Sequence, residues 1–576
     1  MARARTLRAF DSIDKACGSV PERLGSGLPT RVLLIDERVS VPGAAWRGRQ
    51  RVTAFRHLVA RALAAHPVAE FWIARSAGDG SGRWLSECFA GRLPEPLRFA
   101  DDRTTVCQMI ESADHVYTVS APEGMHALLA DVPLHVQGTP YYAGWGLTHD
   151  AYPRPERRSR PSVAMLFYAV FCRLASYRDP SSRARGNLGA LLDCIALQRS
   201  VQQRYAAIPN VVGIRFQLWK RRFATPFLGA GGGSLRWTDD PAAVSSEECA
   251  ALWGARDAHA LPAKARYVRI EDGFLHSTGL GSDLSAPLSQ VVDTLGIYFD
   301  PTRPSDLNRL LNRATFDEAE RARAAALRAR IVAEGLTKYN LGRRRPDWQL
   351  PAGRTVVLVP GQVADDASVR LGTRGISTAE ALLEAVRAAR PDAWIIYKPH
   401  PDVLSGNRRG LVYAARHADR VDTTCDLISL IEIADEVHTL SSLAGFEALL
   451  RGKKVRTYGM PFYAGWGLTD DVLPSLPSRE RTLTLDMLTA GVLLRYPLYW
   501  DWRLMLFTTP EHVVDLLAEH AGRPLRSVAG DRLRLARKAW RWMRNLCAYV
   551  IWRRQARSST RRDRPNQISA SNDLSF

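Results

Sequence analysis

A lysine and a histidine stand in the short segment YKPHPD, directly after an apolar, β-branched stretch. Pro399 and Pro401 stiffen the loop that carries Lys398 and His400. A fixed ammonium group beside an imidazole can bind a phosphate, and the imidazole can exchange a proton near neutral pH. The segment therefore predicts a site for a phosphorylated ligand.

A serine pair opens the helical segment SSLAGFEALL. Ser441 and Ser442 follow another strand-like stretch, and the N–H groups and positive dipole end of a helix N-terminus attract anions. Glu447 lies about one turn into the same helix, where it could accept hydrogen bonds from ribose hydroxyls. Ordinary N-capping by the serines and an exposed helix glutamate are the alternatives, and both stay open.

Two pairs of carboxylates follow two further strand-like stretches. Asp365 and Asp366 stand in GQVADDASV, and Glu271 and Asp272 stand in EDGFLHS. Sugar transfer with retention needs a carboxylate that acts as nucleophile or stabilises an oxocarbenium ion, and commonly a second acid or base. Surface turn acids are the alternative for either pair.

The elements that must position these residues alternate in type. Strands are expected at ARYVRI, RTVVLVP, AWIIYKP, EVHTL and KVRTYG, and helices at TAEALLEAVRAARP and SLAGFEALLRGKK. This alternation is typical of parallel βαβ units, whose ligands bind outside the carboxyl ends of the strands. The polar segments are therefore expected to form one site, which Tyr463 and Trp466 of YAGWG either cover or support as a structural corner.

An internal repeat organises the chain. Val116–Asp150 aligns without gaps on Val437–Asp471, 321 residues further on, with 17 identities in 35 positions. The first copy has no counterpart of EDGF, and we align its Ser76–Asp79 (SAGD) with KPHP and its Ser40–Gly43 (SVPG) with DDAS. His126 takes the position of Glu447. A donor site without these groups should not turn over, so the first copy is expected to be structural or acceptor-binding.

The predicted domain bounds follow from this repeat and from changes in composition, and the roles given to the domains are those that a family resemblance implies. The domains are an N-terminal segment (1–30), a partial and inactive transferase module (31–205), an acceptor-side Rossmann-like domain (210–350), a donor-side Rossmann-like domain (351–520) and a basic amphipathic tail with a disordered end (521–576). The tail places Trp540, Trp542 and Met543 among arginines, which suits an anionic membrane surface. A helix packed on the protein is the alternative.

The overall charge and the cysteines narrow the class of protein. A formal net charge of +20 indicates an anionic partner: nucleic acid, a membrane surface or an acidic substrate. No nucleic-acid-binding motif occurs, so we expect no nucleic acid partner. The eight cysteines form no CxxC or zinc-like spacing, and the start lacks the apolar core of a secretory signal, which together favour reduced thiols and a cytoplasmic location. The longest apolar stretch, VAMLFYAVFC, is too short to span a membrane.

The longer motifs resemble those of a known family. EDGFLHSTGLGSDLSAPLSQVVDTLGIYFDPTRPSDL, GQVADDASV, YKPHPDV and FEALLRGKKVRTYGMPFYAGWGLT are similar to segments of the capsule polysaccharide biosynthesis proteins of the KpsC/LipB type. The resemblance covers about residues 210–510 well and 30–200 partially. It implies an α/β fold with GT-B-like paired Rossmann-type domains and parallel sheets, preceded here by a partial, degenerate copy of the module.

The same resemblance implies an activity. Members of this family are retaining transferases that move Kdo from CMP-β-Kdo onto a Kdo/lysophospholipid acceptor, without a bound metal or other cofactor. The implied partners are the CMP-sugar donor, the anionic glycolipid acceptor, the cytoplasmic face of the inner membrane and other capsule synthesis or export proteins. By position, Asp366 would be the nucleophile, Glu271 the acid or base and Asp272 its support. The expected CMP-binding residues are Lys398, His400, Ser441, Ser442 and Glu447.

A function from another class competes with this one. The chain could be a non-catalytic scaffold or binding protein of capsule assembly that keeps the crevice without using it. The carboxylates and the KPHP segment of the second copy argue against this alternative. One intact module predicts a single type of linkage.

Overall fold

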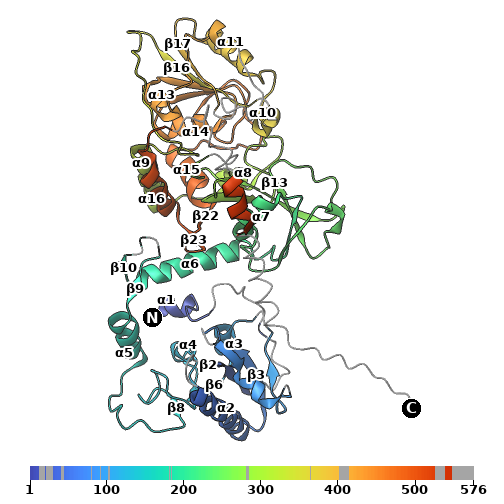
Figure 1. The fold of residues 1–576 in the computed structure, drawn as a ribbon, viewed down its shortest axis with the longest axis vertical. Coiled ribbons are helices and arrows are strands. Elements are labelled where there is room, and N and C mark those ends of the chain that lie inside the picture. Colours follow the sequence, from blue (N-terminus) through green and yellow to red (C-terminus); the bar gives the residue numbers. More distant parts are fainter. Residues whose placement is uncertain are drawn as a thin grey trace, which may run out of the picture. The chain divides into compact units, whose positions relative to one another are not determined.

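The computed structural model forms two compact units, Met1–Ala207 with Gly231–Gly233, and Ile208–Ala230 with Ser234–Phe576 (Figure 1). The described residues are 1–11, 20, 30–40, 45–78, 81–90, 92–101, 104–180, 182, 184–279, 284–363, 365–400, 414–525 and 539–547.

The first unit contains a six-stranded parallel sheet with strand order β5-β3-β1-β6-β7-β8. Its strands, with those of two small two-stranded sheets, are β1 (Thr30–Asp36), β2 (Arg38–Ser40), β3 (Ala69–Arg75), β4 (Ser81–Trp84), β5 (Arg98–Phe99), β6 (His115–Thr118), β7 (Leu134–Val136), β8 (His149–Asp150), β9 (Tyr177–Arg178) and β10 (Arg185–Gly186). Its helices are α1 (Ala2–Thr6), α2 (Ala45–Ala65), η1 (Leu85–Phe89), α3 (Val106–Ser112), α4 (Gly124–Ala130), α5 (Val163–Phe167), η2 (Tyr168–Leu174) and α6 (Leu188–Arg204).

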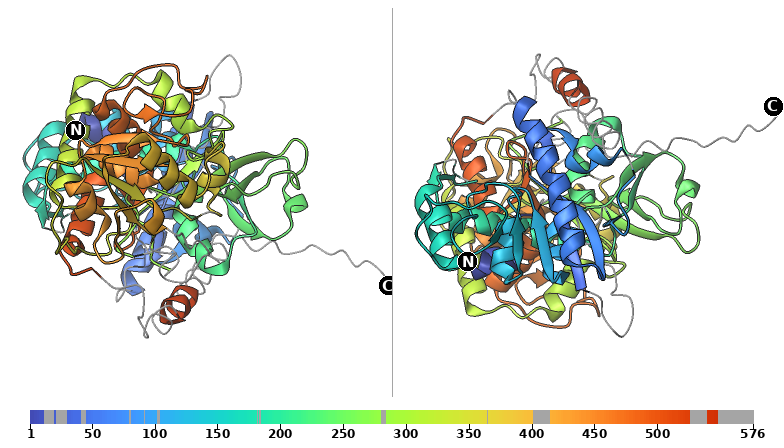
Figure 2. Two further views of the ribbon diagram at one scale, coloured as in Figure 1. Left: turned by 90° about the horizontal axis from the view of Figure 1, so that it is seen from above. Right: turned by 90° about the horizontal axis from the view of Figure 1, so that it is seen from below.

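Alternate side chains of the first sheet enter two different cores. Val32 and Leu34 of β1 pack with Phe55 and Leu58 of α2 on one face, which Figure 2 shows as the long helix across the strands. Leu33 and the other side chains that point to the opposite face of the sheet pack with α3 and α4. A parallel sheet covered by helices on both faces is the arrangement that its nearly continuous apolar strands require.

The second unit contains two larger sheets. Its strands are β11 (Val211–Ile214), β12 (Leu235–Thr238), β13 (Cys249–Trp253), β14 (Arg266–Asp272), β15 (Ser289–Asp293), β16 (Val356–Pro360), β17 (Trp394–Lys398), β18 (Arg420–Val421), β19 (Glu436–Thr439), β20 (Lys454–Thr457), β21 (Asp470–Asp471), β22 (Leu498–Asp501) and β23 (Leu506–Thr508). Its helices are α7 (Leu218–Leu228), η3 (Pro241–Ala243), α8 (Asp306–Arg313), α9 (Glu318–Ala333), α10 (Ala367–Gly372), α11 (Ala379–Ala389), η5 (Ala414–Arg416), α13 (Leu427–Ile433), α14 (Leu443–Leu450), α15 (Leu485–Thr489), η6 (Ala490–Arg495) and α16 (Pro510–Ala521).

The sheet formed by residues 356–471 is parallel, with strand order β18-β17-β16-β19-β20-β21. In chain order this is 3-2-1-4-5-6, the order of a Rossmann fold, and its direction of winding switches between β16 and β19. The sheet of the first unit has the same order. The segments aligned by the sequence repeat therefore occupy equivalent strands in the two sheets.

The other sheet of the second unit is mixed, with strand order β12-β11-β13-β14-β15-β22-β23. Strands β11 to β14 are parallel, whereas β15, β22 and β23 are antiparallel to their neighbours. Residues 498–508, which the sequence assigned to the donor-side domain, thus belong to the acceptor-side sheet. Helix α16 follows them and packs against α9, where Arg323 pairs with Glu511 at 2.7 Å. The donor-side sheet is therefore an insertion within the acceptor-side domain.

Helix starts in the donor-side sheet follow the expected capping rules. Thr378 caps α11 by accepting the N–H of Ala381, and Ser442 caps α14 by accepting that of Ala444. Helix α11 ends before Pro391, which cannot continue a helix. These local contacts explain why two helices predicted from sequence occur where they were expected.

The C-terminal described segment is helical over residues 539–547. Its Asn545 is buried and accepts a hydrogen bond from Arg222 at 3.1 Å, whereas Trp540, Trp542 and Met543 are exposed. Residues 526–538 and 548–576 of the tail, among them Leu533, Leu535, Val550 and Trp552, lie outside the described residues. Among the described helices, none is both long enough and apolar enough to cross a bilayer.

Candidate active site

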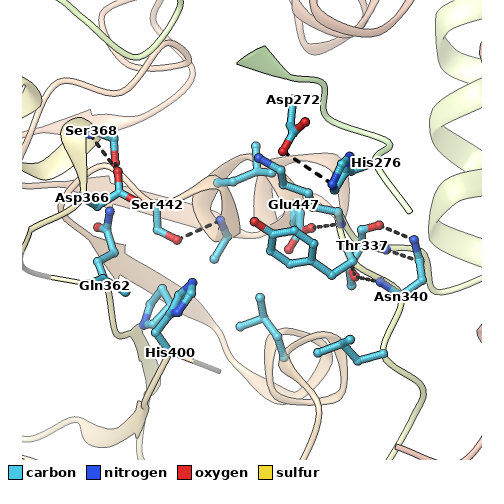
Figure 3. Close-up of a pocket in the computed structure, with 18 of the residues that line it drawn as sticks. Asp272, His276, Thr337, Asn340, Gln362, Asp366, Ser368, His400, Ser442 and Glu447 are labelled. Atoms are coloured by element: carbon cyan, nitrogen blue, oxygen red, sulfur yellow. Dashed lines mark hydrogen bonds and ion pairs between the residues drawn. The ribbon is translucent and has the colours of Figure 1, made fainter. Parts of the chain in front are cut away.

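A cavity of about 1070 Å³ lies in the second unit, and residues of both its sheets line it. The acceptor-side sheet contributes the carboxyl end of β14, and the donor-side sheet contributes the turns after β16, β17 and β19. Figure 3 shows Glu447 between two groups of side chains, with Gln362, Asp366, Ser368, His400 and Ser442 on one side and Asp272, His276, Thr337 and Asn340 on the other.

The donor-side wall is built at the point where the strand order switches. Gln362 follows β16 and accepts the backbone N–H of Ser441 at 2.9 Å, and its amide donates to the Ser441 hydroxyl at 3.1 Å. This side-chain amide ties the turn after β16 to the turn after β19. A crevice at such a switch point is where open α/β sheets bind nucleotides and related ligands.

Ser442 lies at the start of α14 and lines the cavity. Its hydroxyl oxygen accepts the N–H of Ala444 at 3.2 Å, as an N-cap residue does. The helix dipole therefore points its positive end at the cavity. Of the two alternatives read from the sequence, the structure shows the capping, and anion binding at Ser442 stays a prediction.

Asp366 caps the adjacent helix α10 and lines the same wall. Its Oδ1 accepts the backbone N–H of Ser368 at 2.8 Å and the Ser368 hydroxyl at 2.9 Å. Ser441 donates to the Ser368 carbonyl at 3.0 Å. These bonds fix the orientation of the Asp366 carboxylate beside the start of α14.

Lys398 and His400 both line the cavity, as the KPHP segment predicted. The Lys398 ammonium is buried, donates to the Cys425 carbonyl at 2.6 Å and lies 3.8 Å from Asp422. Burial lowers the pKa of Lys398, and the Asp422 charge partly opposes this effect. Lys398 therefore contributes a held positive charge to the cavity wall, not a long, freely reaching arm.

Glu271 and Asp272 end strand β14 at the opposite wall. Burial, reinforced by the charge of Asp272, raises the pKa of Glu271 to about 7. Burial alone would raise the pKa of Asp272 too, but the positive charges of His276, Lys338 and Lys220 lower it. The pair thus separates into one permanent carboxylate and one group that exchanges a proton near neutral pH.

Two lysines and a histidine surround this carboxylate pair. The His276 imidazole is buried with Nε2 3.5 Å from Asp272, and burial lowers its pKa. Although burial disfavours the charged form of Lys338, the neighbouring tyrosines and carboxylates raise its pKa overall. The Lys220 ammonium lies 3.6 Å from the Trp253 ring centroid. A carboxylate on a substrate could be bound here.

Glu447 is buried and supports the loop that carries Lys338. Its Oε1 accepts the Lys338 backbone N–H at 2.9 Å, and burial raises its pKa. Asn340, at the end of this loop, donates to the Ser277 carbonyl at 3.1 Å. Glu447 therefore joins the two walls of the cavity, a structural task that the sequence did not suggest.

The YAGWG segment forms a structural corner. Tyr463 and Trp466 are fully buried, with the Tyr463 hydroxyl donating to the Ser442 carbonyl and the Trp466 indole donating to the Phe462 carbonyl at 2.9 Å. The two rings do not line the cavity, although Phe462 does. Of the two alternatives read from the sequence, support of the start of α14 is the one observed.

Strand register fixes which residues of the first unit correspond to the site. Val32 pairs with Phe71, and Val357 pairs with Ile395. When residues are counted from these pairs, KPHP corresponds to Ala74–Ala77. The sequence alignment with Ser76–Asp79 was therefore wrong by two residues. The segment aligned with DDAS lies largely outside the described residues.

His126, in the position of Glu447, is fully buried in the first unit. Its Nε2 lies 3.1 Å from Oε1 of Glu111, a side chain of the neighbouring helix α3. Burial lowers its pKa, which the Glu111 charge opposes.

Several cavity residues were not singled out from the sequence. Lys338 and Asn340 belong to the short loop TKYN, and Lys220 belongs to α7, near the start of the second unit in the sequence. No motif marks either segment. His276 belongs to the EDGFLHS motif and could have been chosen, because it follows Asp272 by four residues. Among the described residues of this cavity, no three His, Cys, Asp or Glu side chains lie close enough to share a metal ion.

The fold and this cavity define an α/β protein with GT-B-like paired Rossmann sheets, which agrees with the fold class expected from the sequence. The chain belongs to the capsule polysaccharide biosynthesis protein family, whose sequence profile matches residues 54–178 and 248–499.

Two bacterial relatives illustrate the similarity. The capsule polysaccharide modification protein LipA of Neisseria meningitidis serogroup B is 37% identical over 493 residues, covering 82% of this chain and 69% of LipA. The lipopolysaccharide-processing protein LpsZ of Rhizobium meliloti is 44% identical over 258 residues, covering 43% of this chain and 58% of LpsZ.

Two solved structures from Thermosulfurimonas dismutans are also similar to part of the chain. The domain named KpsC, beta Kdo 2,4 transferase is 31% identical and covers 54% of this chain and 98% of its own, with a TM-score of 0.48. The domain named KpsC, beta Kdo 2,7 transferase is 33% identical and covers 54% of this chain and 99% of its own, with a TM-score of 0.45.

Proposed function

We propose that the second unit is a retaining glycosyltransferase that moves Kdo from CMP-β-Kdo onto an anionic glycolipid acceptor, building the linker of a capsular polysaccharide. One observation carries the proposal. A single cavity joins a Rossmann switch point with a helix N-terminus to a buried acid whose pKa is raised to about 7. Membership of the capsule family and the KpsC/LipB-type motifs support the choice of donor and acceptor.

The CMP phosphate is expected to bind at the start of α14. Ser441 and Ser442 present this helix end, and Lys398 and His400 add the cation and imidazole of the neighbouring turn. Backbone N–H groups and the helix dipole favour a phosphate at such a position. Glu447 acts here mainly by holding the Lys338 loop against α14.

The transfer would take two displacements at the anomeric carbon, C2 of Kdo. In the first, an Asp366 carboxylate oxygen forms a bond to C2 while the bond from C2 to the phosphate oxygen breaks, and CMP leaves with the electron pair. In the second, the acceptor hydroxyl oxygen forms a bond to C2 while the Asp366 ester bond breaks. Two inversions give overall retention.

Glu271 is positioned for the proton of the second displacement. In its ionised form it would accept the acceptor hydroxyl proton as the new glycosidic bond forms, and a pKa of about 7 suits this task at neutral pH. Asp272 stays ionised and supports this role, while His276 and Lys338 are placed to bind the Kdo carboxylate. Figure 3 shows Asp366 and Asp272 on opposite sides of the cavity, so the sugar is expected to lie between them.

Location and further partners follow from the acceptor. A glycolipid acceptor would place the enzyme at the cytoplasmic face of the inner membrane, near other capsule synthesis and export proteins. The exposed Trp540, Trp542 and Met543 of the C-terminal helix are suited to insert at an anionic lipid surface. With one catalytic cavity, the chain is expected to form one type of linkage.

The test is Kdo transfer from CMP-β-Kdo, generated in place, to a Kdo-bearing lipid mimic, followed by mass spectrometry. The wild-type chain should add one sugar, and Asp366→Ala should abolish addition while the protein stays folded. Peptide mapping of a slowly turning-over Glu271→Gln chain should find Kdo attached to the peptide that contains Asp366.

Asp365→Ala is the matched control, because Asp365 is the neighbouring carboxylate and lines the same cavity but is exposed, whereas Asp366 is half-buried and caps α10. It should retain transfer within a few-fold of wild type. Absence of transfer by a folded wild-type chain would favour the non-catalytic scaffold function. Equal losses in the two aspartate variants would contradict the specific role of Asp366.

A further inference from the structure

Four imidazoles gather beside β6, β7 and β8 of the first unit, remote in sequence from the motifs of the active site. The His66 and His115 rings lie 4.4 Å apart, and the His115 and His135 rings lie 5.4 Å apart. His149 stacks on His135 with ring centroids 4.7 Å apart. The group lies at a partly exposed position, so ions in solution can reach it.

The ring nitrogens of three of these residues converge. One nitrogen each from His66, His115 and His135 lies within 4.8 Å of the other two. His115 Nδ1 and His135 Nε2 are 3.3 Å apart. Two nitrogens bound to one tetrahedral zinc ion at about 2.0–2.1 Å would lie about 3.3 Å apart. The closest pair therefore already has the spacing of two ligands of one ion. His66, whose Nε2 lies 3.0 Å from the Tyr117 hydroxyl, would move toward this pair to complete a triad.

Two charged groups lie beside the cluster. Asp114 supplies a negative charge beside His115, whereas Arg61, which donates to the His149 carbonyl at 3.1 Å, opposes cation binding.

The equivalent positions of the second unit hold a different kind of network. Strand register and the helix–proline junctions match His66 with Arg390, His115 with Glu436, His135 with Arg456 and His149 with Asp470. There, opposite charges pair: Arg390 with Glu436 at 3.0 Å and Arg456 with Asp470 at 2.8 Å. In the first unit the same four positions carry four imidazoles, which cannot form such ion pairs with one another.

We propose that His66, His115 and His135 bind a divalent transition-metal ion, zinc in particular, at the surface of the first unit. Imidazole ligands suit zinc, copper and nickel, whereas magnesium and calcium prefer oxygen ligands. Three histidines leave a fourth position for water or for His149 after a rotation of its side chain. This site is separate from the transfer chemistry, which the second unit performs.

The bound ion would connect three elements of the first unit. No ion pair among the described histidines of the cluster connects them. His66 directly follows α2, His115 opens β6 and His135 lies in β7. An ion held by all three would fix the end of the helix to the sheet, as the Arg390–Glu436 pair does in the second unit. Its expected role is therefore structural, and its removal should loosen the first unit without changing the catalytic cavity.

The experiment uses the full chain, purified without a histidine tag and stripped of metal by a chelator. Titration with Zn²⁺, followed by equilibrium dialysis and atomic absorption, should reveal one tight site. Co²⁺ in place of Zn²⁺ should give the visible absorption of an ion with nitrogen ligands in low coordination. His135→Gln should weaken Zn²⁺ binding by at least about 100-fold, since loss of a ligand costs more than loss of a supporting residue.

Two further variants keep the test decisive. His57→Gln, an exposed histidine on α2 outside the cluster, should bind Zn²⁺ like wild type. The combined variant His66→Arg, His115→Glu, His135→Arg, His149→Asp installs the ion pairs of the second unit and should fold without binding Zn²⁺. Lack of stoichiometric binding by wild type, or full binding by the combined variant, would overturn the proposal.

Discussion

The two Rossmann sheets share a strand order but present different chemistry at their carboxyl ends. In the second unit, neutral Gln362 joins the switch point by accepting the Ser441 N–H at 2.9 Å. In the first unit, Glu37 takes the place of Gln362 and accepts the Ser120 N–H at 2.7 Å. A carboxylate thus stands where the active cavity has an amide.

A second carboxylate closes the same region of the first unit. Glu123 is fully buried at the start of α4, where it accepts the Ala77 N–H at 2.6 Å and the Ser76 hydroxyl at 2.9 Å. Ser76 takes the place of His400. The protein's own carboxylates therefore bond to the groups that correspond to the cavity wall of the second unit, and Glu37 is itself paired with Arg51. The first unit thus keeps the strand order of the second but fills the corresponding position with its own side chains.

After the loss of transfer expected for Asp366→Ala, the largest expected effect comes from removing Glu271, the proposed proton-transfer group of the second unit. Glu271→Gln should lower kcat by about 10²–10⁴-fold, the usual contribution of a general acid or base. Because the pKa of Glu271 is raised to about 7 and its ionised form is the one required, wild-type kcat/KM should rise with pH through about 7, and the variant should lack this limb. Steady-state kinetics from pH 5.5 to 8.5 measure both effects. Transfer that persists at the wild-type rate would mean that the first unit, or another group, performs the reaction.

A smaller effect is expected from copying the first unit's charge into the second. Gln362→Glu is nearly isosteric and should raise the KM for the CMP-sugar by about 10–100-fold, because the added carboxylate repels the donor phosphate in a partly buried site. Donor titrations of the variant measure the change. Gln362→Met is the matched control, since it removes the hydrogen bonds without adding charge. Equal KM values for the two variants would show that charge is not what separates the two units.

The smallest effect concerns the stability of the first unit. Burial raises the pKa of Glu123 from 4.5 to about 7, so the folded state holds this proton more tightly than the unfolded state. Stability from this group is full below pH 4.5 and is lost as the pH rises through about 7, a difference on the order of 3 kcal/mol. Thermal unfolding between pH 4.5 and 8 should show this fall.

Glu123→Gln should flatten the pH dependence of the first unit's unfolding transition. A remaining slope is expected, because burial also raises the pKa of Asp36 to about 6. Glu156→Gln, at an exposed position, should leave the wild-type profile unchanged. A Glu123→Gln profile as steep as wild type would contradict a buried, proton-holding Glu123.

Local sequence patterns predicted much of the active cavity. Four strands could be predicted because an apolar β-branched run precedes capping and turn residues in each. They end at Asp272, Pro360, Lys398 and Thr439. All eight proposed site residues line the cavity. Their roles in transfer remain predictions, since lining a cavity does not define a role in catalysis.

What could not be predicted depends on contacts between distant residues. Nothing local in LYWD indicates that β22 leaves the donor-side sheet and pairs with β15. The raised pKa of Glu271 depends on its burial, which the Asp272 charge reinforces and which the charges of Lys220 and Lys338, distant in sequence, oppose. The use of Glu447 as a support depends on the Lys338 backbone, 109 positions earlier in the chain. These features come from tertiary packing, which spacing along a sequence does not encode.

The return of β22 and β23 to the acceptor-side sheet also determines which of the two sheets can fold first during synthesis. Until Leu498–Asp501 leaves the ribosome, the edge of β15 has no partner, whereas every strand of the inserted sheet is already available. The inserted sheet can therefore close while the nascent acceptor-side sheet still shows an open edge, a feature that invites pairing with other chains. Chains that stall before residue 498 should thus be the aggregation-prone products of this gene, even though most of their residues are already made.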